Sequence, residues 1–206
     1  MSKIAIIILA AGSSSRLGSP KQLLSYQHKS LLSHTIEAAK NTADSNVVVI
    51  LGDKHEAIAA DIEPLGVNII YNTAWEEGMS SSIRTGLSAL LNFNPEENTS
   101  VTGDTDLDGV ILTVCDQPFL SSVVLQALAD QAKHSGKSIV ASAYKGTLGT
   151  PVYFAKQHFQ ELLELKGAEG ARKLLKKHEA EVASVPFEKG EIDIDTQEDY
   201  QKLISQ

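Results

Sequence analysis

The sequence of 206 residues predicts an α/β fold, with a mostly parallel, Rossmann-like central sheet between two layers of helices. Two observations support this prediction. Short apolar runs rich in β-branched residues recur along the chain, as in strands that are buried on both faces of a sheet. Segments with helical periodicity separate these runs in regular alternation, which is typical of parallel strands joined by helical crossovers.

The first expected strand, Ile4–Leu9, is a continuous apolar run that ends shortly before a glycine. Similar runs and helical segments then alternate up to Ala143. The further strands expected in this part are Val47–Leu51, Val67–Tyr71, Val110–Val114 and Ile139–Ala143, and the expected helices are Leu31–Ala43, His55–Glu63, Ser80–Leu91 and Val123–His134.

Beyond Ala143 the pattern is less regular. No linker rich in proline, glycine or charge interrupts it, so we expect a single domain over residues 1–206, with the polar stretch Asn92–Gly109 as a surface loop. The elements expected in the last part are a short strand at Val152–Phe154, helices at Gln157–Leu165 and Gly170–His178, strands at Val182–Val185 and Ile192–Ile194, and a closing helix at Thr196–Ile204.

The composition argues against several classes of function. Eighteen Lys and Arg against 26 Asp and Glu give a formal net charge of −8, so binding to nucleic acid or to anionic membranes is not expected. The single cysteine, Cys115, excludes an intrachain disulfide and fits a cytoplasmic setting, where we expect it to be a buried hydrophobic side chain. No signal peptide or membrane anchor is expected. The six histidines are scattered, without the spacing of metal ligands, and receive no role.

Residues 9–24, LAAGSSSRLGSPKQLL, follow the first expected strand, where parallel α/β sheets often bind phosphates. Gly12 and Gly18 let the backbone approach a ligand closely and point N–H groups at it. Arg16 and Lys21 add full positive charge. The spacing matches neither a Walker loop nor a dinucleotide-binding fingerprint, because Lys21 follows a proline and no G-x-G-x-x-G is present. A surface turn with two solvated cations is the alternative.

Asp116 comes directly after an expected buried strand and should project at the same sheet edge as the opening loop. A carboxylate there needs a partner, and Mg²⁺ held by one or two carboxylates and by substrate phosphates is favoured. The alternative role, capping the next helix, suits Ser121 or Ser122 better.

A pattern close to Asp116 matches the start of a calcium-binding loop: Asp104, Asp106, Asp108 and Gly109. The twelfth position of such a loop needs a glutamate, but here it is Cys115. We therefore expect these aspartates to lie in a solvated loop.

Two further carboxylates occur in DIDT, residues 193–196. Alternation along a strand would put Asp193 and Asp195 on one face. Capping of the closing helix is an alternative role for Asp195.

Six segments of the chain resemble the MobA-like nucleotidyltransferases, in particular their molybdenum cofactor cytidylyltransferase branch. They occur in order and cover nearly the whole chain. The resemblance implies the fold of nucleotide-diphospho-sugar transferases. After the opening loop, the matching segments are NTAWEEGMSSSIRTGL (72–87), VCDQPFL (114–120), GTLGTPVYF (146–154), GAEGARKLL (167–175) and DIDTQEDY (193–200). One departure is Gln197, where relatives usually have a proline, and it affects the helix start more than the chemistry.

The resemblance also implies roles for individual residues. Asp195, or Asp193 close behind it, would complete the metal site of Asp116, and Arg172 would reach an acceptor phosphate unless it lies on a solvated helix face. Relatives that use guanine tend to read LAGG where this chain reads LAAG, so the base would be cytosine. Residues implied to bind the nucleotide are Leu9, Ala10, Ala11, Gly12, Arg16, Lys21, Gly78, Met79, Ser80 and Ser82, and those implied to bind the acceptor are Gln117, Pro118, Gly149 and Thr150, with Pro151 beside them.

The implied reaction is nucleotidyl transfer, in which an acceptor phosphate attacks the α-phosphorus of a nucleoside triphosphate and pyrophosphate leaves. Asp116 and Asp195 would hold Mg²⁺ against the phosphates, while Lys21 and Arg16, reaching the triphosphate from the other side, would stabilise the charge on pyrophosphate. The implied donor is CTP and the acceptor molybdopterin or its molybdenum-loaded form, with a molybdoenzyme apoprotein or maturation factor as a further partner. The alternatives are a sugar or alcohol phosphate as acceptor, GTP as donor, and a non-catalytic nucleotide-binding module.

Overall fold

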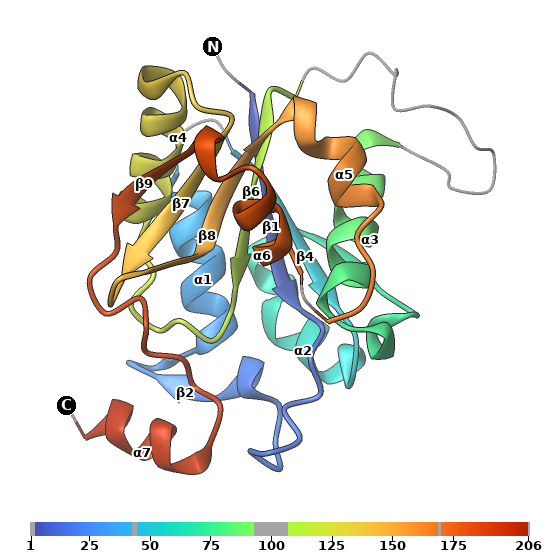
Figure 1. The fold of residues 1–206 in the computed structure, drawn as a ribbon. Coiled ribbons are helices and arrows are strands. Elements are labelled where there is room, and N and C mark those ends of the chain that lie inside the picture. Colours follow the sequence, from blue (N-terminus) through green and yellow to red (C-terminus); the bar gives the residue numbers. More distant parts are fainter. Residues whose placement is uncertain (1–2, 43–44, 93–106, 169, 206) are drawn as a thin grey trace.

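The computed structural model describes residues 3–42, 45–92, 107–168 and 170–205, and these residues form a three-layer α/β fold (Figure 1). Its centre is a seven-stranded sheet with the strand order β5-β4-β1-β6-β8-β7-β9. All neighbouring strands are parallel except β8, which is antiparallel to β6 and β7. The strands are β1 (Ile4–Ala10), β4 (Ser45–Leu51), β5 (Asn68–Tyr71), β6 (Gly109–Val114), β7 (Ile139–Tyr144), β8 (Thr147–Ala155) and β9 (Val182–Pro186). The predicted fold class is therefore confirmed.

Helices cover both faces of this sheet. Because successive side chains of a strand point to opposite faces, Ile6 and Ile8 of β1 pack in one hydrophobic cluster with α1, α2 and α4, while Ala5 and Ile7 pack in another with α3, α5 and α6. The described helices are α1 (Leu31–Lys40), α2 (His55–Ile62), α3 (Met79–Leu91), α4 (Ser122–Ser135), α5 (Phe159–Leu163), α6 (Arg172–Lys177) and α7 (Gln197–Ile204). In the described part of the chain, no helix has the length and apolar character needed to cross a membrane.

The order of the strands determines where a ligand can bind. From β1 the chain builds the sheet outward through β4 and β5, and then returns to add β6 on the other side of β1. At such a switch point the loops after two adjacent parallel strands diverge and leave a crevice at their carboxyl ends. The opening loop follows β1 and Asp116 follows β6, so both lie at this crevice.

The antiparallel strand β8 begins earlier than predicted, at Thr147 instead of Val152. It is joined to β7 through Lys145 and Gly146, which both have positive φ, 44° and 72°. Two such residues in succession make the tight hairpin turn that fits the twist of antiparallel strands. Gly146, which readily adopts positive φ, was a sequence signal for this hairpin turn. The sequence analysis missed it because it expected strands to alternate with helices.

The predicted strand Ile192–Ile194 is wrong, because this segment forms no regular strand. Ile194 instead donates its N–H to the carbonyl oxygen of Asp116 at 2.9 Å and buries its side chain against Leu31 and Leu203. A hairpin of β2 (Ser25–Tyr26) and β3 (Lys29–Ser30) is an element that the sequence analysis missed. Most of the polar stretch Asn92–Gly109, including Asp104 and Asp106, lies outside the described residues, as do residues 43 and 44.

Candidate active site

Gln22 holds the opening loop in shape. Its side chain is buried and its Nε2 atom donates to the carbonyl oxygens of Ala10, at 2.7 Å, and Gly12, at 3.0 Å. The Ser14 hydroxyl donates to Gln22 Oε1 at 3.3 Å and accepts from the backbone N–H of Lys21 at 2.9 Å. These bonds connect the start of the loop to its end, and they set the position from which the Lys21 side chain extends.

The ammonium group of Lys21 lies between two carboxylates. Its Nζ atom is 2.7 Å from Oδ2 of Asp116 and 2.7 Å from Oδ1 of Asp195. Arg16, whose side chain is 68% exposed, contacts the other oxygen of Asp195 at 2.9 Å. Two cations and two carboxylates from three distant parts of the chain therefore meet at the carboxyl edge of the sheet. They are in direct contact, whereas the sequence analysis expected the cations and the carboxylates on opposite sides of a ligand.

These contacts shift the ionisation of the groups involved. Burial by itself would lower the pKa of Lys21, but the negative charge of Asp116, together with hydrogen bonds to Asp116 and Asp195, raises it above its usual value. The hydrogen bond from Lys21 in turn lowers the pKa of Asp195. The lysine is therefore a permanent cation at neutral pH, suited to binding anions and unsuited to acting as a general base.

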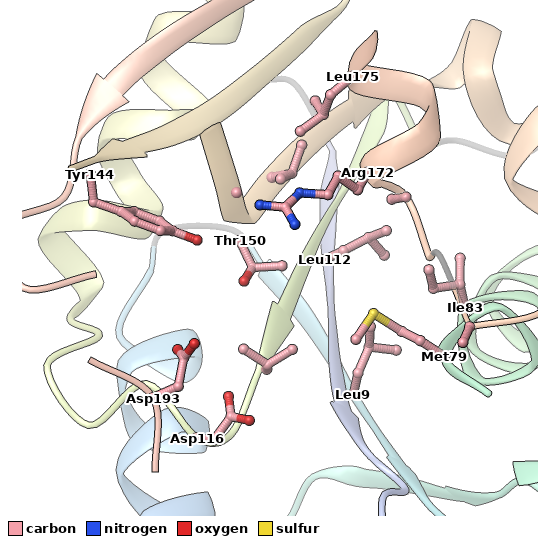
Figure 2. A pocket seen from close by; sticks show the side chains of 15 residues that line it. Leu9, Met79, Ile83, Leu112, Asp116, Tyr144, Thr150, Arg172, Leu175 and Asp193 are labelled. Carbon is pink, nitrogen blue, oxygen red and sulfur yellow. The ribbon is translucent and has the colours of Figure 1, made fainter. Parts of the chain in front are cut away.

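Asp193 is a third carboxylate at the same place, and Figure 2 shows its side chain beside that of Asp116. Burial is the main cause that raises its pKa to about 6, followed by the negative charges of Asp116 and Asp195. The backbone bond from Ile194 to Asp116 brings this segment to the end of β6. Both late aspartates thus come close to Asp116, although not by the strand alternation that the sequence analysis used.

Asp195 does not cap the closing helix. The Thr196 hydroxyl accepts from the N–H of Asp199, and the Asp199 side chain accepts from the N–H of Thr196, which forms a capping box. The alternative role for Asp195 is therefore wrong, and its carboxylate is left to contact Lys21 and Arg16.

Two cavities open on either side of Asp116. The first, of about 330 Å³, lies against the opening loop, and we call it the loop cavity. The second, of about 360 Å³, lies beneath Tyr144 and is drawn in Figure 2; we call it the Tyr144 cavity. Four residues line both of them: Leu9, Met79, Val114 and Asp116.

Most of the residues that the sequence analysis proposed for the nucleotide line the loop cavity. Two do not: Ser80 is fully buried, with its N–H donating to the carbonyl oxygen of Gly167, and Arg16 reaches outward to Asp195. The proposed residues that line the loop cavity are Leu9, Ala10, Ala11, Gly12, Lys21, Gly78, Met79 and Ser82. The sequence analysis missed further residues that line this cavity, including Ser13, Gln22, Trp75 and Glu76. All four stand in segments that carry the resemblance, which was the available signal.

The proposed acceptor residues divide in the same way. Gly149 and Thr150 line the Tyr144 cavity together with Arg172 and Asp193. Gln117 and Pro118 line neither of the two cavities, and Gln117 is buried, with its Nε2 atom donating to the carbonyl oxygen of Gly190 at 2.6 Å. This bond gives Gln117 a role in holding residues 190–195 beside Asp116.

Cys115 is 4% exposed. Burial is the main cause that raises the pKa of its thiol to about 12, with the adjacent Asp116 charge as the next cause. A thiol with such a pKa is neutral at pH 7, which agrees with the expected hydrophobic role.

Comparisons with known proteins identify a family and several relatives. A family model described as the MobA-like NTP transferase domain matches residues 6–182. The purine catabolism protein PucB of Bacillus subtilis (strain 168) is 29% identical over 200 residues, which are 94% of this chain and 92% of that protein. Nicotine blue oxidoreductase of Paenarthrobacter nicotinovorans is 29% identical over 155 residues, 74% of this chain and 67% of that protein.

Solved structures have the same fold. The crystal structure of Rv0371c from Mycobacterium tuberculosis H37Rv superposes with a TM-score of 0.80 at 26% identity and covers 100% of this chain and 99% of its own. The structure of Rv0371c in complex with manganese superposes with a TM-score of 0.76 at 24% identity, covering 99% of each chain.

Proposed function

The chain belongs to the MobA-like NTP transferase family, and from this premise we propose that it transfers CMP from CTP to the phosphate of molybdopterin, with release of pyrophosphate. The observation that carries this proposal is the position of Asp116 where two cavities of about 330 and 360 Å³ meet. A transferase with two substrates needs a pocket for each and a charged group where their phosphates join. The loop cavity would take the nucleotide, and the Tyr144 cavity the acceptor.

The residues at this junction suit a hard divalent cation such as Mg²⁺. Asp116, Asp193 and Asp195 offer carboxylate oxygens, which Mg²⁺ prefers to nitrogen or sulfur. The raised pKa of Asp193 reflects, after burial, the negative charge of the other two carboxylates, so added positive charge would be stabilising there. Asp116 and Asp195 would hold the ion, with Asp193 beside them. The ion would supply positive charge that stabilises the negative charge developing on the substrate phosphates.

The protein's own cations would act on the departing pyrophosphate. Lys21 and the exposed Arg16 would donate hydrogen bonds to the phosphate oxygens of pyrophosphate and stabilise its negative charge. The attacking phosphate monoester is largely dianionic at neutral pH, because its second pKa is about 6, so no general base is required. Catalysis would consist of positioning and charge stabilisation.

The choice of CTP is supported by the wall of the loop cavity. Ala11 lines this cavity, and a glycine at this position would lack its methyl group. A pyrimidine needs less room than a purine, so Ala11 favours cytosine. The substitution Ala11→Gly should therefore move the preference toward GTP.

The choice of acceptor is supported by the lining of the Tyr144 cavity. The lining includes the aliphatic side chains of Leu112, Val152 and Leu175 and the polar side chains of Thr150 and Arg172. Figure 2 shows the guanidinium group of Arg172 above Thr150. A flat heteroaromatic ring with a phosphate tail fits such a cavity better than a sugar phosphate, whose hydroxyl groups would face the aliphatic side chains without partners.

The test is pyrophosphate release with each of the four nucleoside triphosphates, in Mg²⁺ and in Mn²⁺, first with molybdopterin and then with a panel of sugar and alcohol phosphates. We expect release with CTP and molybdopterin, and none from the Asp116→Ala variant, which should keep its fold by circular dichroism. Turnover only with a sugar phosphate would overturn the acceptor assignment. Tight binding of CTP without turnover of any acceptor would favour a nucleotide-binding module, and normal turnover by Asp116→Ala would defeat the metal assignment.

A further inference from the structure

A second group of polar side chains lies at the edge of the sheet opposite the candidate active site. His158 follows the end of β8, which is paired with the beginning of β6, whereas Asp116 follows the end of β6. Glu161 lies one helical turn later, in α5, and His178 follows α6. Figure 1 shows α5 near the end of the molecule from which β1 starts, far from the opening loop. The sequence analysis gave these histidines no role, yet the fold brings them together.

The three side chains point their ligand atoms at one another. The Nδ1 atom of His158 lies 3.8 Å from Oε1 of Glu161, and the Nε2 atom of His178 lies 2.9 Å from the same oxygen. One nitrogen of each ring and one carboxylate oxygen all lie within 4.8 Å of one another. Three such atoms can surround one ion at metal–ligand distances of about 2.0–2.2 Å after small adjustments of the side chains.

His158 is already prepared to act as a ligand. Its side chain is only 3% exposed, and its Nδ1 atom is buried without a hydrogen-bond partner among the described residues. Its other nitrogen, Nε2, lies 2.8 Å from the hydroxyl oxygen of Ser138. When Nε2–H donates to this hydroxyl, Nδ1 carries the free lone pair, which is the arrangement that second-shell partners impose on histidines that bind metals.

Among the residues that the structure describes, Lys177 is the partner of Glu161 that would compete with a metal ion. It contacts the Oε2 atom of Glu161 at 2.6 Å from an exposed position, so the other oxygen remains directed at the two imidazoles. An unpaired buried polar atom such as Nδ1 of His158 costs free energy unless something occupies the space that it faces. The space here is bounded by two nitrogens and a carboxylate.

We propose that His158, Glu161 and His178 form a binding site for a divalent transition metal ion of the zinc class. Imidazole nitrogens combined with a single carboxylate select Zn²⁺ and its neighbours, whereas the oxygen-rich set around Asp116 selects Mg²⁺. The ion would tie α5 to the end of α6. Because Arg172 at the other end of α6 lines the Tyr144 cavity, this connection would also steady one wall of that cavity.

The test is titration of the metal-free protein with Zn²⁺ by calorimetry and with Co²⁺ by absorption spectroscopy, both in millimolar Mg²⁺ to occupy the Asp116 carboxylates. We expect one tight Zn²⁺ site, and visible Co²⁺ bands of the intensity that four-coordinate nitrogen and oxygen ligation gives. The variant His178→Gln should lose at least about 100-fold in Zn²⁺ affinity, since a ligand counts for more than an outer-shell partner. The matched control is His134→Gln, an exposed histidine on α4, which should bind Zn²⁺ as the unchanged protein does.

A second variant tests the outer shell without removing a ligand. Ser138→Ala should weaken Zn²⁺ binding by roughly 10–100-fold, because it frees the ring of His158. This variant tests the role of His158 without replacing that buried side chain, whose substitution could prevent folding. The proposal is overturned if the unchanged protein binds Zn²⁺ no more tightly than His178→Gln, or if the Co²⁺ bands are the same in both proteins. Neither outcome depends on nucleotidyl transfer, so the two proposals stand or fall separately.

Discussion

The Nζ atom of Lys21 lies 2.7 Å from Oδ2 of Asp116, although 95 residues separate the two in the chain. This contact joins the loop after β1 to the end of β6, across the switch point of the sheet. Asp195, 174 residues beyond Lys21, completes the group from the other end of the chain. Lys21 thus neutralises two carboxylates that would otherwise repel each other, and under the proposed function the same three groups would bind the triphosphate and a divalent cation.

The substitution Lys21→Met should separate the structural role of this lysine from its chemical one. With its side chain 14% exposed, loss of the ammonium group should cost about 1–2 kcal/mol of unfolding free energy, less than the 3–5 kcal/mol of a fully buried pair. Pyrophosphate release should fall by about 10²–10³-fold, as when one charge-stabilising donor is lost. Denaturant unfolding and a turnover assay measure the two effects.

Adding Asp195→Asn to Lys21→Met provides the control. Because it removes one of the two repelling carboxylates, the double variant should regain part of the lost stability and none of the lost activity. A double variant with restored turnover would mean that Lys21 only neutralises Asp195 and makes no contact with the nucleotide.

Gln22 is expected to act as a positioning residue. The substitution Gln22→Leu removes the donor to two backbone carbonyls and should cost about 1–3 kcal/mol of stability. The loop that it shapes borders only the nucleotide side, so KM for the triphosphate should rise about tenfold while KM for the acceptor stays unchanged. Gln22→Glu keeps the shape of the side chain but cannot donate two hydrogen bonds, and it should reproduce this pattern. Equal rises in both KM values would contradict it.

The fold was largely predictable because the apolar patterns of strands and helices depend on residues that are close together in the sequence. The run Ile4–Leu9 has one apolar residue after another, as a strand covered on both faces requires, and the structure forms β1 there. The segment Ile192–Ile194 has the same alternation as a strand with one exposed face. A single tertiary bond, from the N–H of Ile194 to the carbonyl of Asp116, and burial against α1 and α7 determine its conformation instead.

The site was predictable where the residue type itself carries the chemistry. Asp116 was found because a carboxylate at the end of a buried strand needs a partner, and Lys21 was found because a cation in the loop after the first strand can bind phosphate. Tyr144 and His158 carry no such signal, since a tyrosine ending a strand and a histidine beginning a helix are ordinary in any α/β protein. Their proposed roles depend on cavities and on contacts between segments far apart in the sequence, which only the folded chain brings together.

Asp193 should make the stability of the metal-free protein depend on pH. Its pKa rises from 3.8 in the unfolded chain to about 6 in the folded protein, so its ionisation disfavours folding, and this cost reaches its full size above about pH 6. The stability that its protonated form contributes is complete below pH 3.8 and is lost progressively up to about pH 6. Asp193→Asn, which cannot ionise, should therefore stabilise the protein above this window and lose that advantage below it.

Thermal unfolding of both proteins without divalent ions, from pH 4 to 8, measures this effect. Solvent screening of a partly exposed carboxylate limits the gain at pH 7.5 to about 1 kcal/mol, which is about 2–4 °C in Tm. Added Mg²⁺ should stabilise the unchanged protein more than the variant. A variant that is less stable than the unchanged protein at every pH would contradict the raised pKa.

Arg172 and Lys173 offer a matched pair for testing the acceptor side. They are adjacent on α6 and both exposed and cationic, but Arg172 lines the Tyr144 cavity, where Figure 2 draws its guanidinium group above Thr150, while Lys173 lines a separate groove with Glu161. If Arg172 binds the acceptor, Arg172→Ala should raise KM for the acceptor about tenfold or more, because a charged hydrogen bond contributes about 1.5–3 kcal/mol. KM for the triphosphate should stay the same.

The control variant is Lys173→Ala, which removes the same charge from the same helix but leaves the lining of the Tyr144 cavity unchanged. It should change neither KM value. Equal effects of the two substitutions would mean that α6 acts through its overall charge, and Arg172 would then be one of several solvated cations on that helix.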